Sequence, residues 1–253
     1  MTEKTGPGDK TGRQVLLPMA SPDALAAAPP MPPRLDQPFV EGWLEGPAGR
    51  IPRVSSHLTT RDHLGTLKAR FGVGRMHYSM DPGLYALGMP HERSPVLVSA
   101  NYKMSFDSLR CALPGRDAWI LVLDTRGINV WCAAGKGTFG TEELLRRIEW
   151  SGLKDIAAHR DLILPQLGAP GVAAHLIKKL SGFTVHYGPV RAKDLPAYID
   201  AGMKAAAAMR IKGFPLADRI VLIPIELIAA LKPSLLIIPA LFLLSGIDRK
   251  SVV

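Results

Sequence analysis

Cysteine is scarce in this sequence of 253 residues, which contains only Cys111 and Cys132. Two isolated cysteines form no CxxC motif and no disulfide framework, and they are too few to hold an iron–sulfur cluster through four thiolates. The amino terminus also lacks an apolar run of signal-peptide length, because it carries Lys4, Asp9 and Lys10. These absences favour a reducing cytosolic setting and give no indication of secretion.

Acidic residues are outnumbered by basic ones, since 31 Lys and Arg against 22 Asp and Glu give a net charge of +9. A basic balance of this size is compatible with nucleic acid, with an anionic membrane surface or with simple solubility, so charge alone selects no partner. Hydrophobic residues make up 47% of the chain, which is enough for one good-sized core. We therefore expect one principal domain.

The first 94 residues lack a clear hydrophobic period. Residues 1–38 hold eight prolines and an alanine-rich patch. This composition buries too little apolar surface to offset the entropy of ordering, so we predict a disordered tail over residues 1–40. Residues 41–94 contain aromatic residues and glycines with weak periodicity, and we expect a lead-in segment of short helices and loops there.

From residue 95 onward, short apolar runs alternate with amphipathic ones, which is typical of a parallel sheet with crossover helices. We predict an α/β fold over residues 95–215: a Rossmann-like parallel sheet with flanking helices. Thr141 is expected to cap a helix, and Gly152 and Gly182 lie where helices are expected to end. The expected strands begin at Pro95, Ala118, Asp161 and Thr184, and the expected helices span residues 105–113, 141–150, 171–180 and 194–209.

The most apolar stretch covers residues 220–247, and Glu226, Lys232 and Pro233 divide it into pieces of 12 and 14 residues. A bilayer span needs about 20 apolar residues, so neither piece spans a membrane alone. A buried pair of core helices, an interfacial hairpin and the truncated start of a membrane domain are three interpretations of this stretch. The basic residues before it favour the third, with the α/β domain facing the cytoplasm from the cytoplasmic membrane.

Residues 248–253 read DRKSVV, which matches the translation of a common sequencing-adapter sequence before a stop. We expect this string to be a non-native end and the natural chain to continue beyond it. Sequencing the genomic locus past codon 247 tests this expectation, and a genuine stop in clean flanking DNA would refute it.

A glycine-containing loop, TRGINVWCAAGKGTFGT, follows the strand expected to end at Asp124. Ligands of open α/β sheets bind beyond the carboxyl ends of the strands, and this loop lies there. A phosphate-binding loop is excluded, because Val130 stands where GxxxxGKS/T needs its first glycine and Gly137 follows Lys136. A cysteine nucleophile stays open, although none of the seven histidines forms a recognisable motif with Cys132.

Cys132 is also suited to a metal, because a thiolate is a soft donor that late or polarisable metals prefer. One cysteine cannot build a zinc site. It can supply one axial ligand to a metal whose other positions a macrocycle already fills, so the loop favours a tetrapyrrole-type cofactor. Packing as a small buried hydrophobic residue is the ordinary alternative for a free cysteine.

Residues 129–136, NVWCAAGK, resemble the cap-helix motif of the corrinoid protein of the bacterial and archaeal mercury-methylation pair at all eight positions. The resemblance covers about residues 95–247 and includes ANYKMSFDSLR, LILPQLGAPGV and SGFTVHYGPVRAKDLP. Parts of the same stretch resemble the large subunit of the corrinoid iron–sulfur protein of the acetyl-CoA pathway. That relative carries cluster-binding cysteines that this chain lacks, and no cysteine is expected there at the position of Cys132. We therefore expect the mercury-methylating family.

This resemblance implies a corrinoid-dependent methyltransferase that passes a methyl group from methylcobalamin to Hg(II), with Cys132 as lower axial ligand to cobalt. It also implies a methyltetrahydrofolate-type methyl donor, a ferredoxin-like partner with two 4Fe–4S clusters, a membrane location and no nucleic acid. The alternative is a corrinoid methyl carrier of the acetyl-CoA pathway. The residues expected to contact the cobalamin are Asn129, Val130, Trp131, Cys132, Ala133, Ala134, Gly135, Lys136, Gly137 and Thr138.

Other loops at the same edge are expected to complete the cofactor pocket. Asn129 is expected to fix its loop through hydrogen bonds, as Asn commonly does in turns. Trp131 either packs in the core or contacts the corrin, and Lys136 either pairs with a corrin side chain or lies in solvent. The additional wall residues are Asn101, Tyr102, Phe139 and the residues 165–168 and 188–190.

Overall fold

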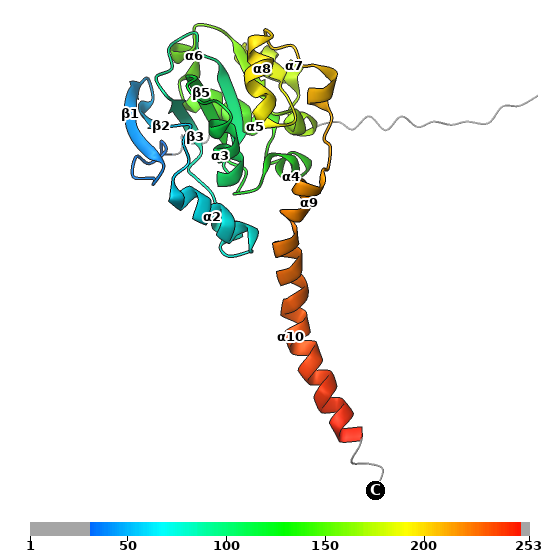
Figure 1. Ribbon diagram of the computed structural model, residues 1–253. Helices are drawn as coiled ribbons and strands as arrows, with labels where there is room; N and C mark the ends of the chain where they lie inside the picture. The colour runs from blue at the N-terminus through cyan, green and yellow to red at the C-terminus, as the bar shows by residue number, and fades with distance from the viewer. Residues whose placement is uncertain (1–30, 249–253) are drawn as a thin grey trace, which may run out of the picture.

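The computed structural model describes residues 31–248 and contains a mixed seven-stranded sheet with the order β1-β2-β3-β5-β4-β6-β7 (Figure 1). Residues 1–30 of the predicted tail and residues 249–253 of the predicted non-native end lie outside the described residues. The strands are β1 (Val40–Gly46), β2 (Gly49–Val54), β3 (Gly83–Leu87), β4 (Val96–Ala100), β5 (Ala118–Leu123), β6 (Asp161–Leu164) and β7 (Thr184–Tyr187).

The four strands β4 to β7 run parallel and form the part of the sheet that was predicted. β4 pairs with β5 from Val96 opposite Trp119, and β6 pairs with β7 from Asp161 opposite Thr184. Every residue of β4 and β5 is buried, as expected for strands that helices cover on both faces. The predicted α/β sheet is confirmed for these strands.

The sheet extends beyond the predicted parallel strands, and its pairing is mixed at the other edge. β3 runs antiparallel to β5, and β1 runs antiparallel to β2. Residues 41–94, expected to form short helices and loops, thus contribute three strands, together with the helix α2 (Thr60–Arg70). β1 alternates between half-buried and exposed residues, which is the period of an edge strand. Two of its four inward positions are Gly42 and Gly46, which have no apolar side chain. The alternation of apolar and polar residues is therefore not visible in the sequence.

Helices cover both faces of the sheet. Alternate residues of β5 face opposite ways: Leu121 belongs to the core that includes residues of α4, α5, α6 and α7, whereas Ile120 belongs to the core that includes residues of α3 and α8. The bounds are α3 (Lys103–Cys111), α4 (Val130–Gly135), α5 (Thr141–Trp150), α6 (Leu153–Ile156), α7 (Ala174–Ser181) and α8 (Leu195–Asp200), with 3-10 turns η1 (Arg75–His77), η2 (Gln166–Gly171), η3 (Ala192–Asp194) and η4 (Ala207–Arg210).

Two details of the predicted helices are wrong. Gly140, not Thr141, is the N-cap of α5, and the Thr141 hydroxyl instead accepts a hydrogen bond from the backbone N–H of Ala173, beside α7. The helix expected over residues 194–209 ends early, because α8 stops at Asp200 and Met203 adopts a left-handed backbone with φ of 63°. The expected helix end at Gly182 is confirmed: it caps α7 with φ of +82°.

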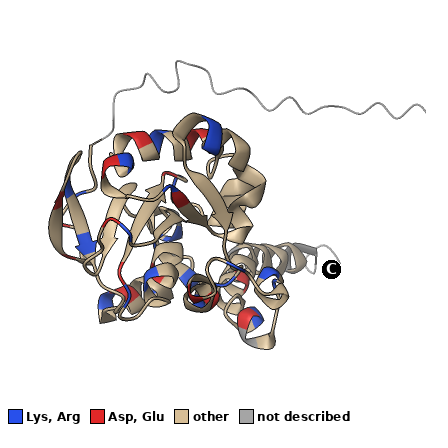
Figure 2. Cartoon of the chain, turned by 90° about the horizontal axis from the view of Figure 1, so that it is seen from above, with Lys and Arg blue, Asp and Glu red and all other residues tan. Residues whose placement is uncertain are grey.

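The carboxyl-terminal stretch forms α9 (Leu216–Ile220) and then α10 (Ile223–Asp248), which projects away from the domain (Figure 1). The predicted division at Pro233 is wrong, because Pro233 and Pro239 both lie inside one continuous helix of 26 residues. Almost all of the α10 ribbon is free of charged residues (Figure 2). The segment Asp218–Ser245 is, by length and composition, the one helix in the described chain that is long and apolar enough to cross a membrane.

Candidate functional site

The loop after β5 places Cys132 on α4, at the carboxyl edge of the parallel strands. Asn129 precedes α4 as its N-cap, and its side-chain oxygen accepts a hydrogen bond from the backbone N–H of Cys132 at 3.0 Å. This bond satisfies one of the N–H groups that a helix start leaves without a partner. Asn129 therefore fixes the start of α4. Cys132, on the first turn of this helix, is exposed.

Asn101, at the end of β4, holds the loop that leads to α4. Its Oδ1 accepts hydrogen bonds from the backbone N–H of Thr125 at 3.1 Å and of Gly127 at 2.9 Å, and its Nδ2 donates to Asp124 at 3.1 Å. The side chain is buried, so these contacts replace its bonds to water. Asn101 was predicted as a wall residue of the pocket, and the structure places it behind the wall as a support.

Glu143 of α5 secures the same loop from the other side and was not predicted as a site residue. One carboxylate oxygen accepts a hydrogen bond from the backbone N–H of Asp124 at 2.9 Å and pairs with Arg147 at 2.6 Å. The only sequence signal for this role was an acidic residue in the first turn of a helix, which equally suits the helix dipole. Partners so distant in sequence come together only in the folded sheet.

η2 packs against α4 and the residues that follow it, and glycine makes this contact possible. A Cβ atom at Gly171 would collide with the carbonyl oxygen of Phe139 and lie 3.1 Å from the Cα of Ala134. Both neighbours are backbone atoms and cannot rotate away. Gly171 therefore sets how closely η2 approaches α4, and through it the position of the loop that carries Cys132.

Gly171→Ala is expected to displace α4 and to lower the free energy of unfolding by about 1–3 kcal/mol, because the added methyl overpacks a backbone contact. Urea denaturation of the full chain measures the effect. Gly135→Ala is the matched control, since a Cβ atom there meets no heavy atom within 4 Å. Equal stability of the two variants would contradict this account of the η2 contact.

A cavity of about 490 Å³ opens beside α4 at the carboxyl edge of the sheet. Three of the predicted cofactor contacts line it: Asn129, Val130 and Trp131. The expected wall loops at residues 165–168 and 188–190 also contribute, through Pro165, Leu167, Gly188, Pro189 and Val190. α3 closes the opposite side with Met104, Ser105, Ser108 and Leu109.

The remaining predicted site residues lie elsewhere. Ala133, Ala134 and Phe139 are buried in the core under α4, so they support the helix from below. Tyr102 is buried too, outside the lining of the cavity. The solvent-exposed members are Cys132, Gly135, Lys136 and Gly137, with Thr138 half-buried.

The surface of α4 fits a large ring that carries its own metal. Trp131 leaves 65% of its surface exposed, directly before the exposed Cys132, and the indole also lines the cavity. A single thiol is the donor set that α4 offers, which suits a metal whose other positions a macrocycle fills. Such a ring would cover the indole, and the cavity would take groups that extend from its edge.

Comparisons with known proteins match this part of the chain. The family model described as CO dehydrogenase/acetyl-CoA synthase delta subunit matches residues 64–199, which run from α2 into α8. The acetyl-CoA decarbonylase/synthase complex subunit gamma of Methanopyrus kandleri is 31% identical over 123 residues, 48% of this chain and 26% of the relative. The subunit gamma of Methanocaldococcus jannaschii is 34% identical over 104 residues, 38% of this chain and 20% of the relative.

These relatives correct the predicted activity. The chain spans about a quarter of the length of the relatives that it matches. Their names place them in an acetyl-CoA decarbonylase/synthase complex. The predicted methyl transfer to Hg(II) is therefore wrong, and the alternative prediction, a corrinoid methyl carrier, agrees better with the matches.

Proposed function

The chain belongs to the CO dehydrogenase/acetyl-CoA synthase delta subunit family, and from this membership we propose that it is a corrinoid-dependent methyl carrier. The family is corrinoid-binding, which agrees with the predicted cobalamin cofactor. The observation that carries the proposal is α4: it presents the exposed Trp131 and Cys132 beside a cavity at the carboxyl edge of the parallel strands. This edge is where open α/β sheets bind their ligands.

The residues of the chain divide the work of holding the cofactor. Trp131 supplies a flat apolar surface, which gains free energy when a ring removes it from water. Cys132 supplies a soft thiolate, and we propose it as a ligand to the cobalt. The corrinoid, when bound, supplies the metal centre that accepts and releases the methyl group. Asn101, Asn129 and Glu143 do not contact the cofactor themselves. They fix the loop that positions Trp131 and Cys132.

Partners and location are part of the same proposal. The relatives are named as subunits of a complex, and an iron–sulfur protein that reduces the cobalt and a methyltetrahydrofolate-type donor fit a carrier of this kind. We also propose that α10 lies in a membrane, with the α/β domain on the cytoplasmic side. The segment Asp218–Ser245 and the basic residues before it support this placement.

The test is to load the full chain with cobalamin under strongly reducing conditions and to add methyl iodide, a donor that needs no partner enzyme. We expect the chain to retain the corrinoid through gel filtration and its absorbance to shift to that of a methylated corrinoid. A chain that retains no corrinoid would refute the cofactor site. A chain that binds corrinoid without becoming methylated would refute the carrier function.

The same experiment separates the α4 site from unspecific binding. Trp131→Ala is expected to weaken corrinoid binding by about 10- to 150-fold, because burial of a large apolar side chain contributes about 1.5–3 kcal/mol. Trp43→Ala is the matched control: its indole is 51% exposed, but it lies on β1, at the other edge of the sheet. Equal losses in the two variants would place the corrinoid elsewhere.

A further inference from the structure

The helix α2 carries an apolar stripe on its outer face. Leu64, Leu67 and Phe71 follow the i, i+3, i+7 spacing that aligns side chains along one side of a helix, and Val73 continues the stripe beyond the helix end. All four side chains are exposed, and Leu64 leaves 56% of its surface open. A contiguous apolar surface of this kind usually marks an interaction site.

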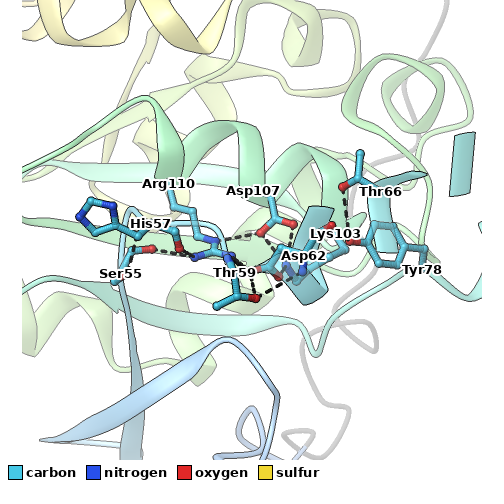
Figure 3. A network of polar contacts seen from close by, with 9 residues as sticks. All are labelled: Ser55, His57, Thr59, Asp62, Thr66, Tyr78, Lys103, Asp107 and Arg110. Carbon is cyan, nitrogen blue, oxygen red and sulfur yellow. Dashed lines mark hydrogen bonds and ion pairs between the residues drawn. The ribbon is translucent and has the colours of Figure 1, made fainter. Parts of the chain in front are cut away.

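The opposite face of α2 is held by buried ion pairs, so the stripe cannot turn inward. Asp62 of α2 pairs with Lys103 at 2.7 Å and with Arg110 at 2.9 Å, both on α3 (Figure 3). Tyr78, which follows η1, donates a hydrogen bond to the backbone oxygen of Asp62 (3.2 Å). These contacts fix the rotation of α2 about its own axis and leave the stripe as a permanent outer surface.

The stripe is continuous with the start of α10. A Cβ atom at Gly72, between Phe71 and Val73, would lie 3.0 Å from the Cδ1 of Ile225. α2 and the root of α10 thus share one side of the domain, the side from which α10 departs (Figure 1). Leu222 and Ile223, at that root, are exposed as well. Any apolar medium that surrounds α10 therefore reaches the α2 stripe.

Basic side chains surround the stripe. Arg61, Lys68, Arg70 and Arg75 lie on α2 and η1. A hollow of about 900 Å³ beside α2 adds the basic residues Arg191, Lys193 and Lys212, with Asp107 and Asp218 as its acidic members. Asp218 pairs with Lys212 at 2.7 Å and with Arg191 at 3.8 Å. Across residues 31–248, the four basic residues of α2 and η1 have no carboxylate within 4 Å, so their charge is available to an anionic partner.

We propose that the α2 face, defined as Leu64, Leu67, Phe71 and Val73 with the flanking basic residues, docks on the surface of an anionic phospholipid bilayer. The stripe enters the interface between head groups and acyl chains, and the basic residues bind the head groups. The proposal rests on the membrane location of α10 and is independent of the corrinoid. It makes the α/β domain sit at a fixed angle to the bilayer instead of swinging on α10.

The experiment places the photo-crosslinker p-benzoylphenylalanine at Phe71, at Leu236 on α10, or at Trp43 on β1, in the full chain reconstituted in phosphatidylglycerol nanodiscs. Mass spectrometry then detects lipid adducts. We expect adducts at Leu236 and Phe71 and none at Trp43. In nanodiscs of phosphatidylcholine alone, the yield at Phe71 should fall several-fold while the yield at Leu236 stays the same, because only the α2 face depends on head-group charge.

The outcomes distinguish the docking of the α2 face from the membrane location of α10. Lipid adducts at Leu236 but not at Phe71 would overturn the docking of α2 and leave α10 in the bilayer. Absence of adducts at both positions would overturn the membrane location too. Cross-linking of Phe71 to a second copy of the chain, in place of lipid, would assign the α2 face to a protein contact.

A charge variant supplies the matched control. Arg61→Gln combined with Lys68→Gln removes two exposed basic side chains that take no part in the buried ion pairs. We expect the yield of lipid adducts at Phe71 to fall several-fold, with the midpoint of urea denaturation and corrinoid retention unchanged. An unchanged adduct yield in this variant would overturn the role of the basic flank.

Discussion

Lys103→Met is expected to lower the free energy of unfolding by about 3–5 kcal/mol, because it leaves buried carboxylates without their counter-charge. The Lys103 ammonium lies 2.7 Å from Asp62 and 2.5 Å from Asp107. The three side chains are at most 8% exposed, so water cannot replace the lost partner. Arg110 alone would then face two carboxylates (Figure 3). Urea denaturation of the full chain measures the loss.

Two controls distinguish a buried network from ordinary ion pairs. Arg116→Met breaks the pair with Asp200, which has a similar distance of 2.7 Å but exposed partners, and should leave the free energy of unfolding almost unchanged. Lys103→Met combined with Asp107→Leu removes one charge of each sign and should recover part of the loss. If Lys103→Met costs no more than Arg116→Met, the network does not carry the stability assigned to it.

The network also has a pH signature. Burial alone would raise the pKa of Asp62, but hydrogen bonds from the Lys103 ammonium and from the backbone of Thr59 outweigh it and hold this pKa well below its usual range. A carboxylate with a lowered pKa in the folded state adds stability above its unfolded pKa of about 3.9 and loses it as the pH falls further. As the pH falls below about 4, the free energy of unfolding of the native chain should therefore decrease more steeply than that of the Lys103→Met variant.

Strands β4 to β7 could be predicted because β4 and β5 are short, continuous apolar runs, and because β6 and β7 continue the alternation of short strands with amphipathic segments. β3 could not, although Leu84 and Tyr85 are buried, because Pro82 precedes it, Gly83 begins it and Gly88 follows it, as in a loop. Its antiparallel pairing with β5 depends on contacts far apart in the sequence. The local pattern thus indicates the strands β4 to β7 and leaves β1 to β3 undetermined.

The candidate site divides in the same way. The position of the Cys132 loop followed from the strand before it, because a loop after a parallel strand lies at the carboxyl edge. Which side of α4 faces the core did not follow, because a helix of six residues shows less than two turns of periodicity. The support from Asn101 and Glu143 was hidden as well, since both bind backbone N–H groups that no side-chain pattern reveals.

The continuity of α10 was also not predicted from the sequence. Lys232 and Pro233 were taken as a division of the apolar stretch, yet α10 continues through both. A proline removes one backbone hydrogen bond and often kinks a helix, but the turns on either side keep their own bonds. The apolar content of the whole stretch was therefore a better guide to this helix than its single interruptions.

Cys132→Ala tests the proposed cobalt ligand most directly, in the full chain loaded with cobalamin. Loss of a residue that only orients a metal ligand typically costs about 10–100-fold in affinity, so loss of the ligand itself should cost at least that much. The absorbance features of sulfur-to-cobalt ligation should disappear from the spectrum. The fold should survive, because the thiol is exposed and the Asn129 cap uses the backbone N–H of Cys132. Cys111→Ala, at the exposed end of α3, should change neither affinity nor spectrum.

Cys132→His separates ligation from shape. An imidazole is larger than a thiol but can still donate to cobalt, so this variant should regain part of the affinity that Cys132→Ala loses, with a nitrogen-ligated spectrum. If the thiol acted only by filling space, histidine would be no better than alanine. Full affinity and an unchanged spectrum in Cys132→Ala would show that α4 holds the ring through Trp131 and the cavity alone. The thiolate would then be a neighbour of the cofactor and not a ligand of its metal.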